Sequence, residues 1–226
     1  MHLHRNKKIF LYFFLFLLIG TLNNKNLDKL HFNNINKIII TGLDDKNNNE
    51  LKKKLEILKL KNIFFINDLT INEIINSNNL VEKFTVFKQY PSSLNIKIDK
   101  TKFIAQVKKG ENNFLLGTNG KLIKLLEKNK NLPPLIFGNF ENENFFKLKK
   151  AIDDSNFDYD KIKNLFFFPS GRWDIETTSG LLIKLPTHNA KLSLERGIKF
   201  LENNNGKKIK EIDLRQQNQI IIINGL

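Results

Sequence analysis

The chain contains three kinds of hydrophobic pattern: one continuous apolar run, stretches with helical spacing, and many short stretches that alternate as strands do. The continuous run, Ile9 to Leu22, has no charged side chain, and Arg5, Lys7 and Lys8 precede it. As a helix it would be about 21 Å long, shorter than the ~30 Å hydrocarbon core of a bilayer, although lysines at its end can extend the span. It offers no pair of small residues where a signal peptide would be cut. We therefore predict an uncleaved transmembrane anchor at residues 9–22, with a cleaved signal peptide or a buried soluble helix as alternatives.

The segments on either side of this run predict its orientation. Residues 1–8 form a short basic tail, and short segments rich in Lys and Arg stay in the cytoplasm. Residues 23–34 are polar and rich in Asn, which is typical of a linker. The body of the chain would then lie outside the cytoplasm, as in a single-pass type II membrane protein.

The hydrophobic pattern of residues 35–100 predicts a compact unit with the order β-α-α-β-β. Its opening strand is the β-rich run that Gly42 ends, and Leu51, Leu55 and Leu58 recur with the spacing of one helical face. A second helix is indicated by the capping-box spacing of residues 70–73. Two further strands follow, at residues 81–90 and 94–98, with Pro91 in the turn between them.

Residues 101–226 predict a second, β-rich domain with a mainly antiparallel, curved sheet and two helices. One helix carries the stripe Phe145, Leu148 and Ile152, and Asn189 is a candidate N-cap for the other. The chain closes with the four β-branched residues of Ile220 to Ile223, which we interpret as an edge strand that can pair with another chain. The predicted fold class is α+β.

Composition narrows the possible functions. The chain is 41% hydrophobic with 20 Phe, enough to fill real cores, and it has no Cys, which excludes disulfides and Cys-based metal sites. Its net charge of +14 suggests nucleic acid, but Lys, Asn, Ile and Phe are all abundant together and the lysines are interleaved with Glu and Asp. We therefore predict no nucleic-acid partner.

We find no constellation of residues that predicts catalysis. The four histidines, at positions 2, 4, 31 and 188, are scattered without metal-ligand spacing, and no nucleophile elbow or glycine-rich phosphate loop is present. Asp153 and Asp154 are adjacent at the predicted end of a helix, which favours a helix stop over a pair of catalytic acids. We predict a protein that is not an enzyme, with no cofactor, no metal and no small-molecule substrate.

Together these features resemble one family, the bacterial cell division proteins called FtsQ or DivIB. The local matches are an opening strand that ends at Gly42, a strand–Tyr-Pro–strand segment, an Arg-Trp strand followed by a Leu-Pro strand, and a closing Ile-Asp-Leu-Arg. These segments are residues 38–42, 86–98, 172–175, 180–186 and 212–215, and a further match is the segment of residues 63–67 before the second helix. The resemblance implies a POTRA-like domain and a β domain behind a single membrane anchor.

The resemblance also implies a function. Members of this family are non-enzymatic scaffolds of the division complex, the divisome, in the inner membrane at the septum. They link early and late division proteins and bind the single-span partners FtsB and FtsL with the periplasmic domain. We therefore expect FtsB-like and FtsL-like partners, other division proteins and the inner membrane, with the C-terminal domain in the periplasm.

The resemblance and the edge strand together point to candidate binding residues. We expect a partner strand against Ile220, Ile221, Ile222 and Ile223, by β-augmentation, unless this strand is already paired internally. Arg215, with Gln216 beside it, is the candidate to bind a partner carboxylate, and the alternative is that Arg215 only ties down the sheet edge. Arg172 and Trp173 are possible secondary contacts, or packing residues of the core.

Two other functions stay open on the sequence alone. One is a POTRA-containing component of protein export or outer-membrane assembly, which would need further POTRA repeats or a C-terminal barrel. The other is a secreted basic protein that binds an anionic polymer, which would need a cleaved N-terminus and strongly salt-dependent binding.

Overall fold

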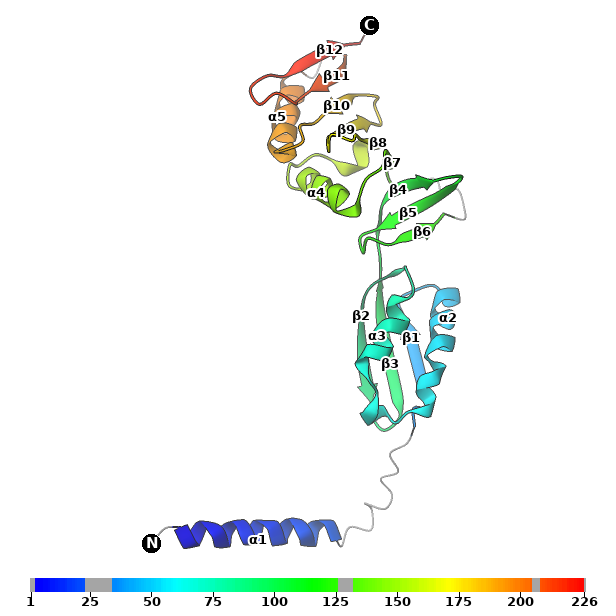
Figure 1. Cartoon of the computed structure of the whole chain (residues 1–226), viewed down its shortest axis with the longest axis vertical. Helices are drawn as coiled ribbons and strands as arrows, with labels where there is room; N and C mark the ends of the chain where they lie inside the picture. The colour runs from blue at the N-terminus through cyan, green and yellow to red at the C-terminus, as the bar shows by residue number, and fades with distance from the viewer. Residues whose placement is uncertain (1–2, 23–33, 126–131, 205–207, 226) are drawn as a thin grey trace. The chain divides into compact units, whose positions relative to one another are not determined.

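The computed structural model describes residues 3–22, 34–125, 132–204 and 208–225 of the chain (Figure 1). Residues 23–33 of the predicted linker and residues 1–2 of the predicted tail lie outside these ranges. Contacts between Cα atoms divide the chain into two units. Unit 1 comprises residues 1–77 and 84–98, and unit 2 comprises residues 78–83 and 99–226.

Helix α1 (Leu3–Leu22) contains the apolar run predicted to cross a membrane. Among the described residues, however, no helix has both the length and the apolar character that a membrane crossing requires. The predicted transmembrane helix at residues 9–22 is thus corrected. The helix forms, but Arg5, Lys7 and Lys8 stand within its first two turns and leave only about 21 Å without charge.

The part of unit 1 after α1 has the predicted β-α-α-β-β order, with two short 3₁₀ helices between its α-helices. Its sheet has the order β1-β3-β2, and β1 runs parallel to β3. The elements are β1 (Lys37–Thr41), α2 (Asp45–Leu55), η1 (Glu56–Leu60), η2 (Ile63–Phe65), α3 (Asp68–Asn76), β2 (Val81–Gln89) and β3 (Ser93–Lys100).

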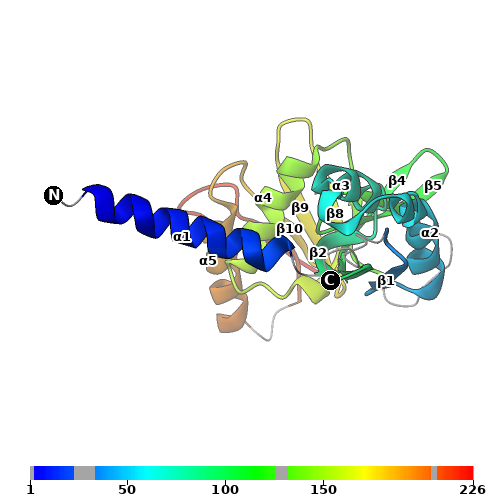
Figure 2. The same ribbon diagram turned by 90° about the horizontal axis from the view of Figure 1, so that it is seen from below.

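Helices α2 and α3 cover one face of this three-stranded sheet (Figures 1 and 2). Their inner side chains, Leu51 and Leu55 of α2 and Ile71 and Ile75 of α3, are buried as the periodicity predicts. The capping box predicted at residues 70–73 is wrong, because α3 begins earlier: the side-chain oxygen of Asn67 accepts a hydrogen bond from the N–H of Leu69 at 2.9 Å.

Gly42 ends β1 for a steric reason. Its φ is +115°, a conformation that disfavours any side chain, and a Cβ placed there would lie 1.8 Å from the carbonyl oxygen of Ile98. The glycine therefore allows β1 and β3 to approach at this end of the unit.

Unit 2 contains a nine-stranded sheet with the order β12-β11-β10-β9-β8-β7-β4-β5-β6. The strands are β4 (Phe103–Lys109), β5 (Asn112–Gly117), β6 (Leu122–Lys124), β7 (Leu135–Phe137), β8 (Ile162–Phe167), β9 (Trp173–Thr177), β10 (Leu182–Lys184), β11 (Ile209–Asp213) and β12 (Ile221–Asn224). The helices are α4 (Asn142–Asp153), α5 (Ala190–Asn203) and the 3₁₀ turn η3 (Tyr159–Lys161).

This sheet is mixed, whereas the sequence predicted a mainly antiparallel one. Most neighbouring strands are antiparallel, but β10 runs parallel to β11, and β7 runs parallel to both β4 and β8. Parallel neighbours need a crossover, and α4 and α5 lie in the crossovers from β7 to β8 and from β10 to β11. The two predicted helices thus account for two of the parallel pairings.

The core of unit 2 lies between these two helices and one face of the sheet. One row of side chains crosses five strands in register: Ile136, Leu165, Ile175, Ile183 and Ile212. All five are buried in one cluster with Phe145, Leu148 and Ile152 of α4 and Leu194 of α5. Asn189 does stand at the N-cap of α5, but in a left-handed conformation (φ 61°) and without the side-chain capping bond that its position predicts.

Candidate functional site

The last strand of the chain forms one edge of the nine-stranded sheet. β12 is terminal in the strand order and pairs with β11 in antiparallel orientation. In the ranges of the chain that the structure describes, no strand lies on its other side. Such an edge presents backbone N–H and C=O groups that a strand from another chain can bind.

The alternation of a strand identifies the backbone groups on the open side of β12. The N–H of Gly225 donates to the carbonyl oxygen of Lys208 at 2.7 Å, so Gly225 faces β11. Successive residues of a strand point their backbone groups in opposite directions, so the odd-numbered residues of β12 face β11. Ile222 and Asn224 therefore direct their N–H and C=O groups away from the sheet.

The contact between β11 and β10 leads to the same assignment. The N–H of Leu214 donates to the carbonyl oxygen of Lys184 at 2.9 Å, so the backbone of Leu214 faces β10. Asp213, one residue earlier, must then face β12, where it stands opposite Ile221. Asp213 and Ile221 thus form an inward-facing pair.

A β-bulge lies in this strand pair. Ile209 is opposite Asn224, but Glu211 is opposite Ile223, so β11 contributes one extra residue at this point. The bulge explains why Lys208, just before β11, and Asp213, at its end, both face β12 although one is even-numbered and the other odd-numbered.

The side chains of the last strand divide between the two faces of the sheet. Ile220 and Ile222 pack against the core cluster. Ile221 and Ile223 point to the other face and are 51% and 50% exposed. The edge therefore offers a bonding backbone next to two apolar side chains that water reaches.

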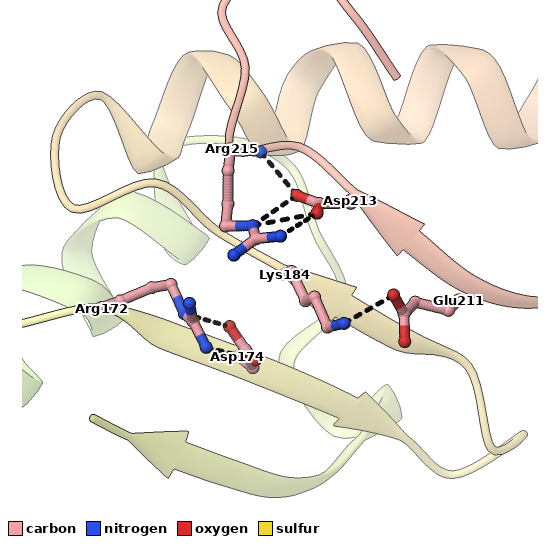
Figure 3. A network of polar contacts seen from close by, with 6 residues as sticks. All are labelled: Arg172, Asp174, Lys184, Glu211, Asp213 and Arg215. Atoms are coloured by element: carbon pink, nitrogen blue, oxygen red, sulfur yellow. Dashed lines mark hydrogen bonds and ion pairs between the residues drawn. The ribbon is translucent and has the colours of Figure 1, made fainter. Parts of the chain in front are cut away.

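On this second face, polar side chains continue across the neighbouring strands. Ile221 of β12 stands opposite Asp213 of β11, which stands beside Lys184 of β10, which faces Asp174 of β9. Figure 3 shows ion pairs between residues of this row and partners outside it: Lys184 Nζ lies 2.6 Å from Glu211 Oε1, and Arg172 Nε lies 3.1 Å from Asp174 Oδ1. The face next to β12 thus carries alternating charges.

Arg215, the predicted carboxylate binder, is bonded to Asp213 of its own chain (Figure 3). Its Nε lies 2.9 Å from both carboxylate oxygens of Asp213, and Nη2 and the backbone N–H also donate to this carboxylate. These hydrogen bonds hold the pKa of the Asp213 carboxyl below its ordinary value and raise the pKa of the Arg215 guanidinium. The Arg215 side chain is still 44% exposed, so it can accept a further partner.

Asp174 is the most buried acid of this face, with 3% of its surface exposed. Burial raises the pKa of its carboxyl, and the positive charges of Arg172 and Lys184 offset only part of that effect. Arg172 binds this carboxylate and also stacks over the ring of Phe168, 4.2 Å from its centroid. Arg172 therefore has packing and ion-pair partners within the domain.

Trp173, next to Arg172, points to the opposite face. It is 6% exposed and its ring lies 4.7 Å from that of Phe167 and 5.8 Å from that of Phe140. The structure places Trp173 in the core, where it is a packing residue.

Gln216 lies exposed in the loop between β11 and β12. Residues of this loop line a groove together with Arg215 and residues of α5. Leu192, 57% exposed, is the large apolar side chain of the groove. The other lining residues include His188, Arg196, Lys199, Gln217 and Asn218.

The sequence did not predict the partners of Arg215 and Arg172 within the chain. Asp213 and Asp174 each stand two residues from their arginine, a spacing that brings both side chains to one face of a strand. That spacing is visible in the sequence. The pair Lys184–Glu211 is not, because it depends on the parallel register of β10 and β11. Among the described residues, no group of three His, Cys, Asp or Glu side chains is arranged to hold a metal.

Comparison with protein families gives two matches that follow each other along the chain. Residues 33–100 match the POTRA domain of FtsQ type, and residues 105–215 match the C-terminal domain of cell division protein FtsQ/DivIB. The second match ends at Arg215, so β12 lies beyond it.

Among curated proteins, the chain is similar to the cell division protein FtsQ of Rickettsia bellii. The two are 24% identical over 199 residues, which are 83% of this chain and 71% of the relative. A solved structure of the major extracytoplasmic domain of the cell division protein DivIB from Geobacillus stearothermophilus, as its trans isomer, is also similar at 17% identity. It covers 48% of this chain and 99% of that domain with a TM-score of 0.34, too low to compare the arrangement of elements.

Proposed function

The chain belongs to the FtsQ/DivIB family of cell division proteins, and from this premise we propose that it is a non-enzymatic scaffold of the divisome that binds FtsB-like and FtsL-like partners at β12. One observation carries the proposal: β12 has an open edge whose outward backbone groups lie next to two half-exposed isoleucines. A partner strand would add to this edge by β-augmentation. Backbone hydrogen bonds would supply affinity, and Ile221 and Ile223 would select apolar side chains on the partner.

Arg215 would bind a partner carboxylate without leaving Asp213. A guanidinium has five N–H donors, and the bonds to Asp213 use only those of Nε and Nη2. The remaining donors on Nη1 can bind a carboxylate from the groove side, where Gln217 and Asn218 offer further polar groups. Asp213 would hold the guanidinium in place before the partner arrives, which lowers the entropy cost of binding.

We further propose that the body of the chain acts outside the cytoplasm at the division septum, with α1 associated with the inner membrane. The described side chains of α1 from Ile9 to Ile19 support this association. Its large apolar residues are 38–74% exposed, and a membrane would bury them. Membrane fractionation with carbonate extraction, together with a C-terminal reporter active only outside the cytoplasm, tests it. A chain found in the soluble fraction would contradict the association.

The central test replaces an outward-facing residue of β12 by proline. In Ile222→Pro, the ring removes an N–H that faces the open side and obstructs an incoming strand, while the bonds between β11 and β12 remain. We expect at least about tenfold weaker co-purification with FtsB and FtsL, the loss that corresponds to roughly 1.4 kcal/mol.

The matched control makes the same chemical change at the other edge of the same sheet. Lys124→Pro also removes an outward-facing N–H, this time from β6, and should leave partner binding unchanged. Undiminished binding by a folded Ile222→Pro variant would rule out β12 as the binding edge. Ile221→Pro is less useful, because the Ile221 N–H faces β11 and its loss would disturb the sheet itself.

A further inference from the structure

Exposed apolar side chains gather at one end of unit 1. Leu60, Phe64, Phe65, Leu69 and Tyr90 are between 51% and 81% exposed. We call these five residues the apolar end. The ring of Tyr90 stacks on that of Phe64, with 4.7 Å between their centroids, so residues from the η2 turn and from the turn after β2 form one surface.

These five side chains are not needed to fill the core of this region. Leu58, Ile63 and Ile66, from the same stretch of chain, are at most 6% exposed and supply the core contacts of this region. Leu60, Phe64, Phe65 and Leu69 lie within three residues of them in sequence but are exposed, and Tyr90 joins them through its contact with Phe64. A cluster of exposed, large apolar side chains marks an interaction surface.

The apolar end lies where the chain enters the β-α-α-β-β part of unit 1 from the side of α1. The N–H of Ile35 donates to the carbonyl oxygen of Lys61 at 3.2 Å, and Asn34 forms a β-bridge with Asn62. Residue 34 is therefore next to the segment that carries Leu60 and Phe64. Residues 23–33 separate it from α1, and even a fully extended segment of that length spans no more than about 40 Å. Whatever surface holds α1 is within reach of the apolar end.

Positive charge surrounds the apolar end. Lys59 and Lys61 flank Leu60, and Lys37 begins β1 at the same end. Lys88 lies 3.7 Å from Asp68 at the start of α3, which places a fourth lysine there, and Lys59 lies 3.2 Å from Glu56. These two carboxylates offset part of the charge, and Lys37 and Lys61 add to it. Each lysine near an anionic bilayer contributes about 1 kcal/mol of attraction, and Tyr and Phe favour the interfacial region of a membrane.

We propose that the apolar end of unit 1 docks on the anionic surface of the membrane with which α1 associates. The inference rests on the proposed membrane association of α1 and adds a second contact to it. The rings of Phe64, Phe65 and Tyr90 enter the interfacial region, and the lysines bind lipid phosphates. This contact holds the apolar end of unit 1 at the bilayer surface, in addition to the association of α1.

The absence of Cys from the chain permits a direct test with single introduced cysteines. The full chain is inserted into vesicles of phosphatidylethanolamine and phosphatidylglycerol that contain spin-labelled lipids. A fluorophore is attached to Phe65→Cys at the apolar end, to Leu17→Cys in α1, or to Lys46→Cys. Lys46 is exposed in the first turn of α2, next to the end of β1 that is opposite the apolar end.

We expect strong quenching at positions 65 and 17 and none at position 46, with quenching at 65 falling at least about twofold in purely zwitterionic vesicles. Quenching at 17 without quenching at 65 would overturn the docking while leaving the association of α1 intact, and would point to a protein partner for this surface. Quenching at neither position would overturn both. Because Phe65 is 81% exposed, its replacement should leave the fold unchanged, which circular dichroism can verify.

Discussion

β6 and β12 form the two edges of one nine-stranded sheet, yet they present different chemistry. β6 is three residues long, ends in Lys124, and its outward-facing Leu122 carbonyl accepts a hydrogen bond from the Asn79 side chain at 2.9 Å. β12 carries only isoleucines and an asparagine, and its outward-facing groups meet no strand in the described part of the chain.

The difference between the edges indicates where the sheet can accept another chain. Short strands, lysines and side-chain caps are the means by which proteins prevent unwanted edge pairing. β6 has all three. β12 lacks the lysine and exposes two isoleucines instead, which would be a hazard in a protein that used no partner there. We infer that the β12 edge is kept open for binding.

The largest expected effect comes from giving β12 the chemistry of β6. In the double variant Ile221→Lys, Ile223→Lys, two half-exposed apolar side chains become charges on the face that a partner strand would cover. We expect roughly 30- to 100-fold weaker binding of FtsB, about 2–3 kcal/mol, because both apolar contacts are lost. Isothermal titration calorimetry with the purified partner segment measures it. Binding within threefold of wild type would remove the distinction between the two edges.

A smaller effect, on the free energy of unfolding, is expected from the ion pair between Asp213 and Arg215 next to β12. Asp213→Asn removes the carboxylate that holds Arg215, opposite Ile221, and should lower the free energy of unfolding by about 1 kcal/mol at pH 7, a charged hydrogen bond discounted for the exposure of Arg215. The pKa of Asp213 is depressed in the folded chain, so its contribution is present above the ordinary carboxyl value of 3.8 and is lost as pH falls below it.

Urea unfolding of both proteins at several pH values tests this prediction. The difference between wild type and Asp213→Asn should be full above pH 3.8 and should shrink as the pH falls through the depressed pKa of Asp213. Asp174 has a raised pKa and acts in the opposite direction, but it is present in both proteins and cancels in the difference. A difference that does not vary with pH would show that the ion pair contributes nothing to the stability of this edge.

Asn79→Ala tests the protection of the β6 edge. The variant loses the bond to Leu122 and leaves that outward-facing carbonyl without its cap. We expect a loss of at most about 1 kcal/mol in unfolding free energy and no change in FtsB binding. Asn49→Ala, at an exposed position of α2, is the matched control. Impaired partner binding in Asn79→Ala would implicate the β6 edge as well.

The smallest effect is expected for Arg215→Lys. Lysine keeps the charge but lacks the planar fork, so it cannot keep several bonds to Asp213 while it makes a bidentate contact with a partner carboxylate. We predict binding weakened about two- to fivefold, with the salt dependence largely kept. Arg215→Ala should lose both affinity and part of the salt dependence. Equal binding by wild type and both variants would show that Arg215 only stabilises the sheet edge and does not contact the partner.

The sequence predicted the elements that depend on local patterns. The β-α-α-β-β order of unit 1 follows from helical spacing at Leu51 and Leu55 and from alternation in the later strands, and both signals are short-range. The four β-branched residues at the end of the chain likewise indicated a strand, and the structure places Ile221–Asn224 at an edge.

The failures have physical causes that local patterns do not contain. Thr70 and Glu73 have the spacing of a capping box, but Asn67 competes for the same helix start and caps it first. The parallel pairing of β10 with β11 depends on how α5 packs, so the ion pair between Lys184 and Glu211 was invisible in the sequence. Helix α1 begins at Leu3, before the apolar run, so it includes Arg5, Lys7 and Lys8.

The bulge between Ile209 and Glu211 determines what a guest strand would encounter. Sliding β12 along β11 by one position would require the extra residue to move as well, and it would swap the faces of all the isoleucines. The bulge therefore fixes the register of β12 on β11. Because the faces of β12 are fixed, every second residue of a guest strand would lie beside Ile221 and Ile223, so the sequence of a cognate strand should itself alternate apolar and polar residues.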